Sequence, residues 1–243
     1  MIILVTDFGV GSPYLAQMRS ALFMHSADGE IVDLVSDLAP FNIEAASHFL
    51  VSHVPYFPKG TIFLSVVDPG VGGKRRAVVL HADGNWFIGP ENGIFDQVTA
   101  RAESVSYFQI MWEPDHLSNT FHGRDLFAPI AAKISSNTLS DGDIMETILP
   151  SIRNGSHNLH KVIYLDRYGN AITGVRAGSL SGNDTVVING VTVRNSATFS
   201  DRAIGEPFWY DNSVGLLEIA VNQGSARDRL DIEVGTAVSI ITE

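Results

Sequence analysis

The feature that most restricts the fold is a regular alternation of short apolar runs and helix-like segments over the first 67 residues. Residues 2–6 are a run rich in branched side chains and too short for a helix, which is typical of a strand buried on both faces. Residues 31–35 and 61–67 have the same character, and the segments between these runs have helical periodicity. This order places the chain in the α/β class and predicts an N-terminal, mostly parallel sheet flanked by helices.

Both intervening helices carry start or stop signals. Ser12 followed by Pro13 is a typical helix start, and the apolar spacing after it predicts a helix to about residue 27. Asn42 can cap a second helix, which Pro55 ends.

Polar side chains follow two of the predicted strands. Asp7 and Asp68 each come directly after a strand, and ligands bind outside the carboxyl ends of strands in such sheets. The loop over residues 68–76 contains three glycines and places Arg75 seven residues after Asp68. His122 lies at the start of a helix predicted over residues 123–134. These features predict a site at one rim of the sheet.

The same residues have plainer interpretations. Glycine-rich turns with flanking charges are mostly connections, and Asp125 near a helix start can simply complement the helix dipole. A metal phosphoesterase with Asp7, Asp68 and His122 as ligands is another reading. Against it, Arg75 beside Asp68 would repel a dication, and we assign no metal site.

The pattern changes near residue 150, where the chain becomes polar and rich in turns. Asn189-Gly190 between two β-branched runs is a strong signal for a two-residue hairpin. We therefore predict two domains, an α/β domain over residues 1–155 and a smaller, antiparallel β-barrel-like domain over residues 156–243. Short strand candidates in the second domain are residues 161–165, 185–188, 191–193, 216–221 and 237–242.

Composition excludes several classes of protein. With 16 Lys+Arg against 27 Asp+Glu the net charge is −11, which argues against nucleic acid or an anionic membrane as a partner. There is no cysteine, so disulfides, thiolate zinc sites and cysteine nucleophiles are impossible. No apolar run approaches the length of a membrane span, and residues 1–9 lack the pattern of a secretory leader. We expect a cytoplasmic protein.

Seven motifs, in the expected order and spread over nearly the whole chain, resemble one family. They are residues 6–9, 54–58, 67–72 with 75–76, 90–93, 120–125, 166–170 and 217–225. Together they resemble the S-adenosylmethionine hydroxide adenosyltransferases, adenosine-forming S-adenosylmethionine hydrolases related to fluorinases and chlorinases.

The resemblance implies a reaction without a cofactor or metal, in which water or hydroxide displaces L-methionine from C5′ of S-adenosyl-L-methionine and leaves adenosine. It implies a catalytic trio of Asp68, Arg75 and His122. It also implies a homotrimer whose active sites lie where the first domain of one subunit meets the second domain of its neighbour. Methionine leaves a sulfonium as a neutral thioether, so the enzyme needs to orient a water and help remove its proton.

The resemblance further implies contacts to the substrate. The substrate-binding residues it implies are Asp7, Phe41, Asp166, Asn170, Tyr210, Ser213, Glu218 and Val221. Asp7 would hold the ribose hydroxyls, Asn170 would read adenine, and Asp166 would hold the methionine amino group. Simpler structural interpretations are also open: Phe41 could be a core residue, and Asn170 could be a turn residue. Simple strand packing would explain Glu218 and Val221.

The chain departs from the family pattern at three positions. Glu91 replaces the usual Asp, Tyr168 replaces a common Phe, and Val214 follows Ser213 where a small polar residue or an Arg is frequent. Halogenases of the superfamily replace the catalytic acid and carry an inserted loop; here Asp68 is present and residues 74–86 have no insertion. Hydrolysis is favoured over halide transfer and over a module that only binds an adenosyl ligand.

Overall fold

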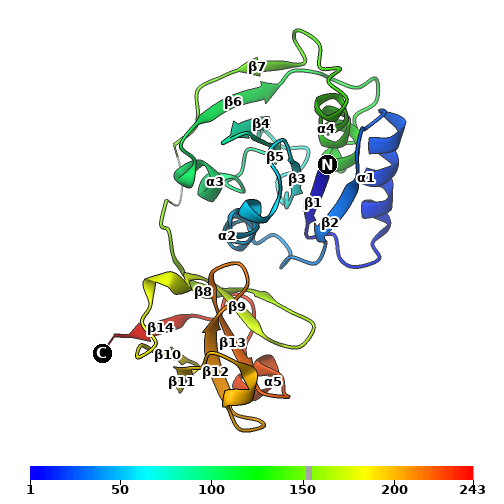
Figure 1. Cartoon of the computed structure of the whole chain (residues 1–243). Helices are drawn as coiled ribbons and strands as arrows, with labels where there is room; N and C mark the ends of the chain where they lie inside the picture. The colour runs from blue at the N-terminus through cyan, green and yellow to red at the C-terminus, as the bar shows by residue number, and fades with distance from the viewer. Residues whose placement is uncertain (152–154, 243) are drawn as a thin grey trace. The chain divides into compact units, whose positions relative to one another are not determined.

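The computed structural model describes residues 1–151 and 155–242 (Figure 1). Among these residues, no helix is long and apolar enough to cross a membrane. The chain forms two compact units, each described by itself below. The first comprises Met1–Ser47 with Pro55–Gly155, and the second comprises His48–Val54 with Ser156–Glu243.

The first unit contains a seven-stranded sheet. In spatial order its strands are β2 (Ile31–Val35), β1 (Ile2–Thr6), β3 (Ile62–Val66), β5 (Asn85–Pro90), β4 (Ala77–Ala82), β6 (Val105–Ile110) and β7 (Ile144–Glu146). The pairs from β2 to β5 are parallel, whereas β5–β4, β4–β6 and β6–β7 are antiparallel. The α/β class is confirmed, but the sheet is mixed rather than mostly parallel. The chain reverses at Asp83 and Gly84, both with positive φ, and the later strands continue antiparallel.

Helices cover this sheet where the sequence signals place them. They are α1 (Pro13–Met24), α2 (Ile43–His53, with its second half grouped with the other unit) and α4 (Ala128–Ser135). A further helix, α3 (Asp96–Arg101), was not predicted. The N–H of Tyr14 is capped by the Ser12 hydroxyl, and the Asn42 side chain accepts from the N–H of Ala45 at 3.0 Å. The helix expected to reach residue 27 ends at Met24, because Ser26 takes a positive φ.

The helix predicted from residue 123 begins with a π-helical turn, η2 (Gly123–Phe127), before α4. Helices α1 and α4 with η2 pack on one face of the sheet, as Figure 1 shows for the two α-helices. Ile2, Leu4 and Leu64 from β1 and β3, all fully buried, form the centre of that core. This packing fixes the segments that flank the carboxyl ends of β1 and β3.

The second unit is a nearly closed, mostly antiparallel barrel. Its strands, in spatial order, are β14 (Val238–Ile241), β10 (Thr185–Ile188), β11 (Val191–Asn195), β12 (Pro207–Asp211), β13 (Leu216–Val221), β9 (Ala171–Arg176) and β8 (Leu159–Leu165). A bridge between Lys161 and Ala237 links the two outer strands, and β11–β12 is the parallel pair. The Asn189-Gly190 hairpin is confirmed, with positive φ at both residues.

The barrel unit also contains the short helix α5 (Ala226–Leu230), and short 3₁₀ turns complete the described elements. These turns are η1 (Val54–Tyr56), η3 (Ala177–Ser179) and η4 (Phe199–Asp201). The barrel-like second domain expected from the sequence is therefore present, although β9 and β12 were not predicted.

Candidate active site

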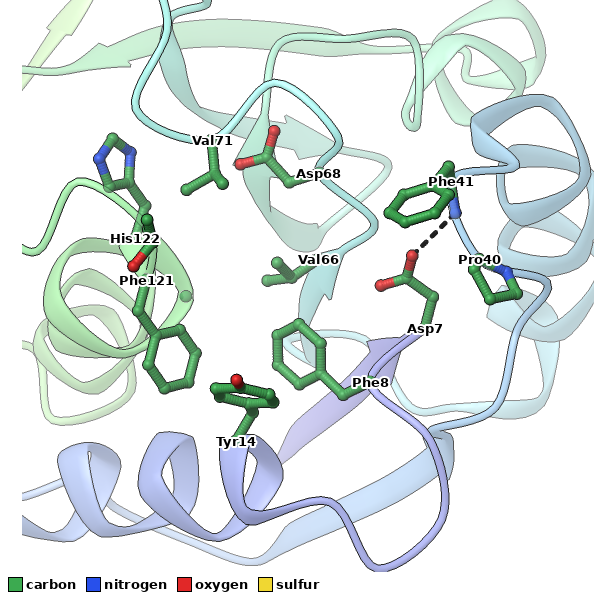
Figure 2. Close-up of a pocket in the computed structure, with 12 residues that line it drawn as sticks. Asp7, Phe8, Tyr14, Pro40, Phe41, Val66, Asp68, Val71, Phe121 and His122 are labelled. Atoms are coloured by element: carbon green, nitrogen blue, oxygen red, sulfur yellow. Dashed lines mark hydrogen bonds between the residues drawn. The ribbon is translucent and has the colours of Figure 1, made fainter.

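A pocket of about 290 Å³ opens at the carboxyl ends of β1 and β3 (Figure 2). It is lined by Asp7, Phe8, Tyr14, Pro40, Phe41, Val66, Asp68, Val71, Thr120, Phe121, His122 and Gly123. Asp7 directly follows β1 and Asp68 follows β3 by two residues. Because β1 and β3 are parallel neighbours, their carboxyl ends meet at one edge of the sheet, and both carboxylates reach the same pocket.

Asp68, Arg75 and His122 form one hydrogen-bonded network at this pocket. The Nε of Arg75 lies 3.0 Å from both carboxylate oxygens of Asp68, and its Nη2 also donates to Oδ2. The same Nη2 lies 2.9 Å from Nδ1 of His122. The side chains of Asp68 and Arg75 are only 5% and 10% exposed. The structure thus brings together three residues that are up to 54 positions apart in the sequence.

The network defines the protonation state of His122. A guanidinium group has donors but no acceptor, so Nδ1 of His122 accepts from Arg75 and the ring proton resides on Nε2. Burial, and next the charge of Arg75, lower the pKa of His122 below its usual 6.5, and the charges of Asp68 and Asp125 oppose this only partly. His122 is therefore neutral near pH 7.

The glycine-rich loop takes its conformation from close backbone contacts. Gly72 has φ +75°, and a Cβ there would lie 2.2 Å from the carbonyl oxygen of Asn119. Only glycine allows this approach, which brings the loop of Asp68 against the segment that leads to His122. On the other side, the amide of Asn92 donates to the carbonyl of Val67 at 2.8 Å. The motif over residues 90–93 therefore supports the position of Asp68.

Asp7 and Phe41 form the opposite side of the pocket, joined by the hydrogen bond drawn in Figure 2. The N–H of Phe41 donates to Oδ2 of Asp7 at 3.0 Å. Burial raises the pKa of Asp7, and the hydrogen bond from Phe41 partly offsets this. Phe41 has φ +65° and is 71% exposed, so it is not the core residue of its plainer reading. A left-handed conformation at an aromatic residue is strained, and such strain clusters at ligand sites.

Three aromatic rings form the third wall of the pocket. Phe8, Tyr14 and Phe121 pack edge to face, with ring centroids 5.3 to 6.0 Å apart. Figure 2 places them together on the side opposite Asp68. None of these three residues was predicted as part of the site. Phe8 and Phe121 belong to the motifs over residues 6–9 and 120–125, whereas nothing in the sequence distinguishes Tyr14 from an exposed residue of the first helical turn.

The other expected substrate-binding residues lie in the barrel unit. Oδ1 of Asp166 accepts from the N–H groups of Tyr168 and Asn170, both at 2.8 Å. Its Oδ2 accepts from the side-chain amide of Asn170 at 2.9 Å. Asp166 thus organises the turn between β8 and β9, and the amide of Asn170 is held by that carboxylate. Ser213 is exposed in the turn between β12 and β13, and Val221 is buried in the apolar core of the barrel.

Tyr210 and Glu218 face each other across β12 and β13. The Tyr210 hydroxyl donates to Oε1 of Glu218, and the amide of Asn212 donates to Oε2 at 2.9 Å. Glu218 is 6% exposed, and burial raises its pKa. Burial, followed by the contact with Glu218, also raises the pKa of Tyr210. The charge of Asp166 adds to both shifts, so its carboxylate acts on this network as well.

Among the described residues, no group of three or more His, Asp or Glu side chains is arranged to hold a metal ion. Asp68 and His122 are instead joined by hydrogen bonds through Arg75, which lies at the centre of their network. Such an arrangement can orient a small polar molecule beside the apolar wall of the same pocket.

Comparisons with known proteins connect this geometry to a chemistry. The family model of the SAM hydroxide adenosyltransferase N-terminal domain matches residues 2–142, and that of the C-terminal domain matches residues 160–239. An (R)-S-adenosyl-L-methionine hydrolase of Thermus thermophilus is 34% identical, with 98% of each chain covered. A protein of the same name from Methanocaldococcus jannaschii is 29% identical, covering 99% of this chain and 95% of its own. The crystal structure of an uncharacterized conserved protein from Thermotoga maritima superposes with a TM-score of 0.89 at 28% identity, covering 99% of this chain and all of that one.

Proposed function

The chain belongs to the SAM hydroxide adenosyltransferase family, and from this premise we propose that it hydrolyses S-adenosyl-L-methionine to adenosine and L-methionine, with Asp68 acting on the attacking water. Full-length relatives at about 30% identity with this chain carry that activity in their names. The observation that carries the assignment of roles is the Asp68–Arg75–His122 network at the pocket.

The reaction is a displacement at C5′ of the substrate. The oxygen of water forms a bond to C5′ as the C5′–S bond breaks, and the bonding electron pair passes to sulfur. The sulfonium becomes the neutral thioether of methionine, so no acid is needed to assist the leaving group. The attacking water loses one proton, which Asp68 accepts and passes to solvent. Substrate and water give adenosine, methionine and one proton.

Arg75 and His122 position Asp68 for this role. Arg75 holds both carboxylate oxygens of Asp68, so the acid keeps one orientation toward the pocket. His122 accepts from the same Nη2 and fixes the guanidinium in turn. With Nδ1 engaged and Nε2 protonated, neither ring nitrogen of His122 is available to take a proton from water. The base of the reaction is therefore Asp68, with His122 as a neutral support.

The remaining residues bind the substrate. Asp7 suits two vicinal ribose hydroxyls because a carboxylate has several acceptor positions, and Phe41 lies beside it at the exposed side of the pocket. In the barrel, the substrate contacts are Asp166, Asn170, Tyr210, Ser213, Glu218 and Val221. Support for these roles is strongest at Glu218, a buried carboxyl group held by polar partners within a barrel strand. For Val221, burial in the barrel core favours packing through its side chain.

Three further assignments extend this proposal. They are the division into domains 1–155 and 156–243, the homotrimer, and the cytoplasmic location. The first two are checked by limited proteolysis and by light scattering of the purified protein. A molar mass three times the chain mass of 26.3 kDa is the expected result for the trimer.

Hydrolysis is tested with the purified protein and S-adenosyl-L-methionine in ¹⁸O-labelled water, using the (R) and (S) sulfonium epimers separately. We expect adenosine and methionine in equal amounts, with one ¹⁸O in the 5′-hydroxyl of adenosine. Parallel incubations with chloride and fluoride look for 5′-halogenated product. Recovery of intact substrate after long incubation, with adenosine still binding to the protein, would show a binding module instead.

A further inference from the structure

The segment that follows His122 contains two charged residues, Arg124 and Asp125, that the proposed reaction does not use. They lie in the π-helical turn η2. Turns of this kind are rare and occur often at functional sites. The contacts of Arg124 and Asp125 indicate what this turn supports.

Arg124 connects three parts of the first unit. Its Nε and Nη2 donate to the two carboxylate oxygens of Asp125, and its Nη1 donates to Oε1 of Gln17 on α1 at 2.9 Å. Its guanidinium carbon lies 5.1 Å from the centre of the Phe121 ring, a cation–π arrangement. One side chain therefore links the π turn, helix α1 and the aromatic wall of the pocket.

Phe121 also contacts a residue of the same helix directly. Tyr14 and Gln17 are three residues apart on α1 and so share one face of it. Tyr14 packs its ring edge to face with Phe121 at 5.3 Å, and Gln17 receives Arg124. Phe121 thus contacts a ring that lies on α1 and a guanidinium that is hydrogen-bonded to α1. This arrangement fixes the residue directly before His122.

Asp125 also supports this wall of the pocket. Its contacts are specific hydrogen bonds and not a general interaction with the helix dipole. Besides Arg124, its Oδ2 accepts from the N–H of Ser118 at 2.9 Å. That bond joins the start of the segment 118–122 to the π turn that follows this segment. A carboxylate with this use is a fixed cross-link within the pocket wall.

We propose that Arg124 is a positioning residue for the hydrolysis, which holds Phe121 against Tyr14 and so fixes the aromatic wall and the adjoining His122. This inference rests on the proposed function of the pocket. Its physical basis is that a displacement reaction depends on the placement of substrate and water, and a misplacement of about 1 Å can cost about a hundredfold in rate.

The test compares Arg124→Ala and Arg124→Lys with Arg19→Ala. Arg19 is a matched control, because it also pairs with an acid in the first unit, Asp33 at 2.7 Å, and its side chain is 34% exposed against 36% for Arg124. We expect Arg124→Ala to lower kcat/KM at least tenfold, while its Tm stays within a few degrees of that of Arg19→Ala. Millimolar methylguanidinium should restore part of the activity. Arg124→Lys keeps the charge without the planar fork and should fall between wild type and Arg124→Ala.

Two results would overturn the proposal: a loss in Arg124→Ala smaller than tenfold, or an equal loss in Arg19→Ala. If the wild-type protein hydrolyses nothing, the proposed function fails, and the position of Phe121 is then decided by NMR. Ring signals of Phe121, assigned with Phe121→Leu, should move in Arg124→Ala and stay in place in Arg19→Ala. Signals that do not move in Arg124→Ala would refute the positioning role whatever the activity.

Discussion

Asp68 in the first unit and Glu218 in the barrel are both buried acidic residues held by neighbouring side chains, but the chemistry of their partners differs. Asp68 is held by the guanidinium of Arg75, which carries a full positive charge. Glu218 receives the Tyr210 hydroxyl and an amide, both neutral donors, and burial raises its pKa. A carboxylate beside a cation at a pocket suits action on water. A buried acid among neutral donors suits recognition by hydrogen bonds.

The largest expected effect is that of removing the charge of Asp68. In Asp68→Asn the side chain can still accept a hydrogen bond from Arg75, but it is a far weaker base. We expect kcat to fall by about 10² to 10⁴, the usual contribution of a proton acceptor, with KM changed little. The measurement is initial rates of adenosine formation, and Asp33→Asn, at the exposed ion pair with Arg19, is the control. If the kcat of Asp68→Asn stayed within a few-fold of that of wild type, the proposed difference in role between Asp68 and Glu218 would be wrong.

The corresponding change in the barrel is Glu218→Gln. Here we expect KM to change and kcat to stay nearly the same, the opposite of the result for Asp68→Asn. The amide that this change introduces could accept from Asn212 and donate to Tyr210, so the network can be satisfied without charge. KM should rise about fivefold, since each good hydrogen bond to substrate contributes about 1 kcal/mol, and kcat should stay within about threefold of wild type. Glu206→Gln, in the partly exposed pair with Arg202 in the same barrel, is the control. A kcat loss as large as that of Asp68→Asn would place Glu218 in the chemistry.

The pH dependence of stability should have opposite signs at His122 and Glu218. The pKa of His122 is lowered in the folded protein, so the unfolded chain binds more protons below pH 6.5, and the free energy of unfolding rises with pH up to that value. The pKa of Glu218 is raised, so the folded state binds more protons, and stability falls as pH rises from 4.5 through the folded pKa. Each slope is at most about 1.4 kcal/mol per pH unit.

The measurement is urea unfolding between pH 4 and 8 for wild type, His122→Gln and Glu218→Gln. His122→Gln should remove part of the rise, and Glu218→Gln should remove part of the fall. Differences from wild type isolate each group, because the pKa of Asp7 is also raised and that of His53 is also lowered. Equal slopes in both variants would mean that the two sites do not differ electrostatically.

The parts of the fold that local chemistry specifies were predictable. Asn42 and Pro55 bound α2, and Asn189-Gly190 marks a hairpin, because capping and positive φ act within a few residues. Strand β9 was missed because Gly174 interrupts its pattern. A Cβ at that glycine would lie 2.6 Å from Cβ of Leu159, so the glycine is required by close packing against β8.

The candidate site was also predictable only in part, because some of its contacts depend on tertiary packing. Asp7 and Asp68 could be brought together from the strand order alone, since parallel neighbours share an edge. The contact of Arg75 with His122, which defines the tautomer, joins segments 47 residues apart through the approach at Gly72. The π turn at Gly123–Phe127 and the hydrogen bond from Arg124 to α1 produce no periodic pattern in the sequence, so neither could be predicted from it.

The smallest expected effect concerns backbone strain, which differs between one residue of the first unit and one residue of the barrel. Phe41 beside the pocket and Asn189 in the barrel hairpin both have positive φ, at +65° and +47°. Asparagine tolerates this region, and the Asn189 side chain also donates to two carbonyls, at 2.7 and 2.9 Å. Phe41 has a bulky, mostly exposed ring, which can form no such side-chain hydrogen bonds.

Glycine at each position should therefore change stability with opposite sign. Phe41→Gly relieves strain of about 1 kcal/mol or more, offset in part by the backbone entropy of glycine, so we expect the free energy of unfolding to stay level or rise by up to about 1 kcal/mol. Asn189→Gly loses its side-chain bonds and should cost about 1 kcal/mol. Urea unfolding measures both, and KM should rise only for Phe41→Gly, which removes a ring from the pocket. A Phe41→Gly protein clearly less stable than wild type would mean that the ring is held by packing, and the strain beside the pocket would then have no link to substrate binding.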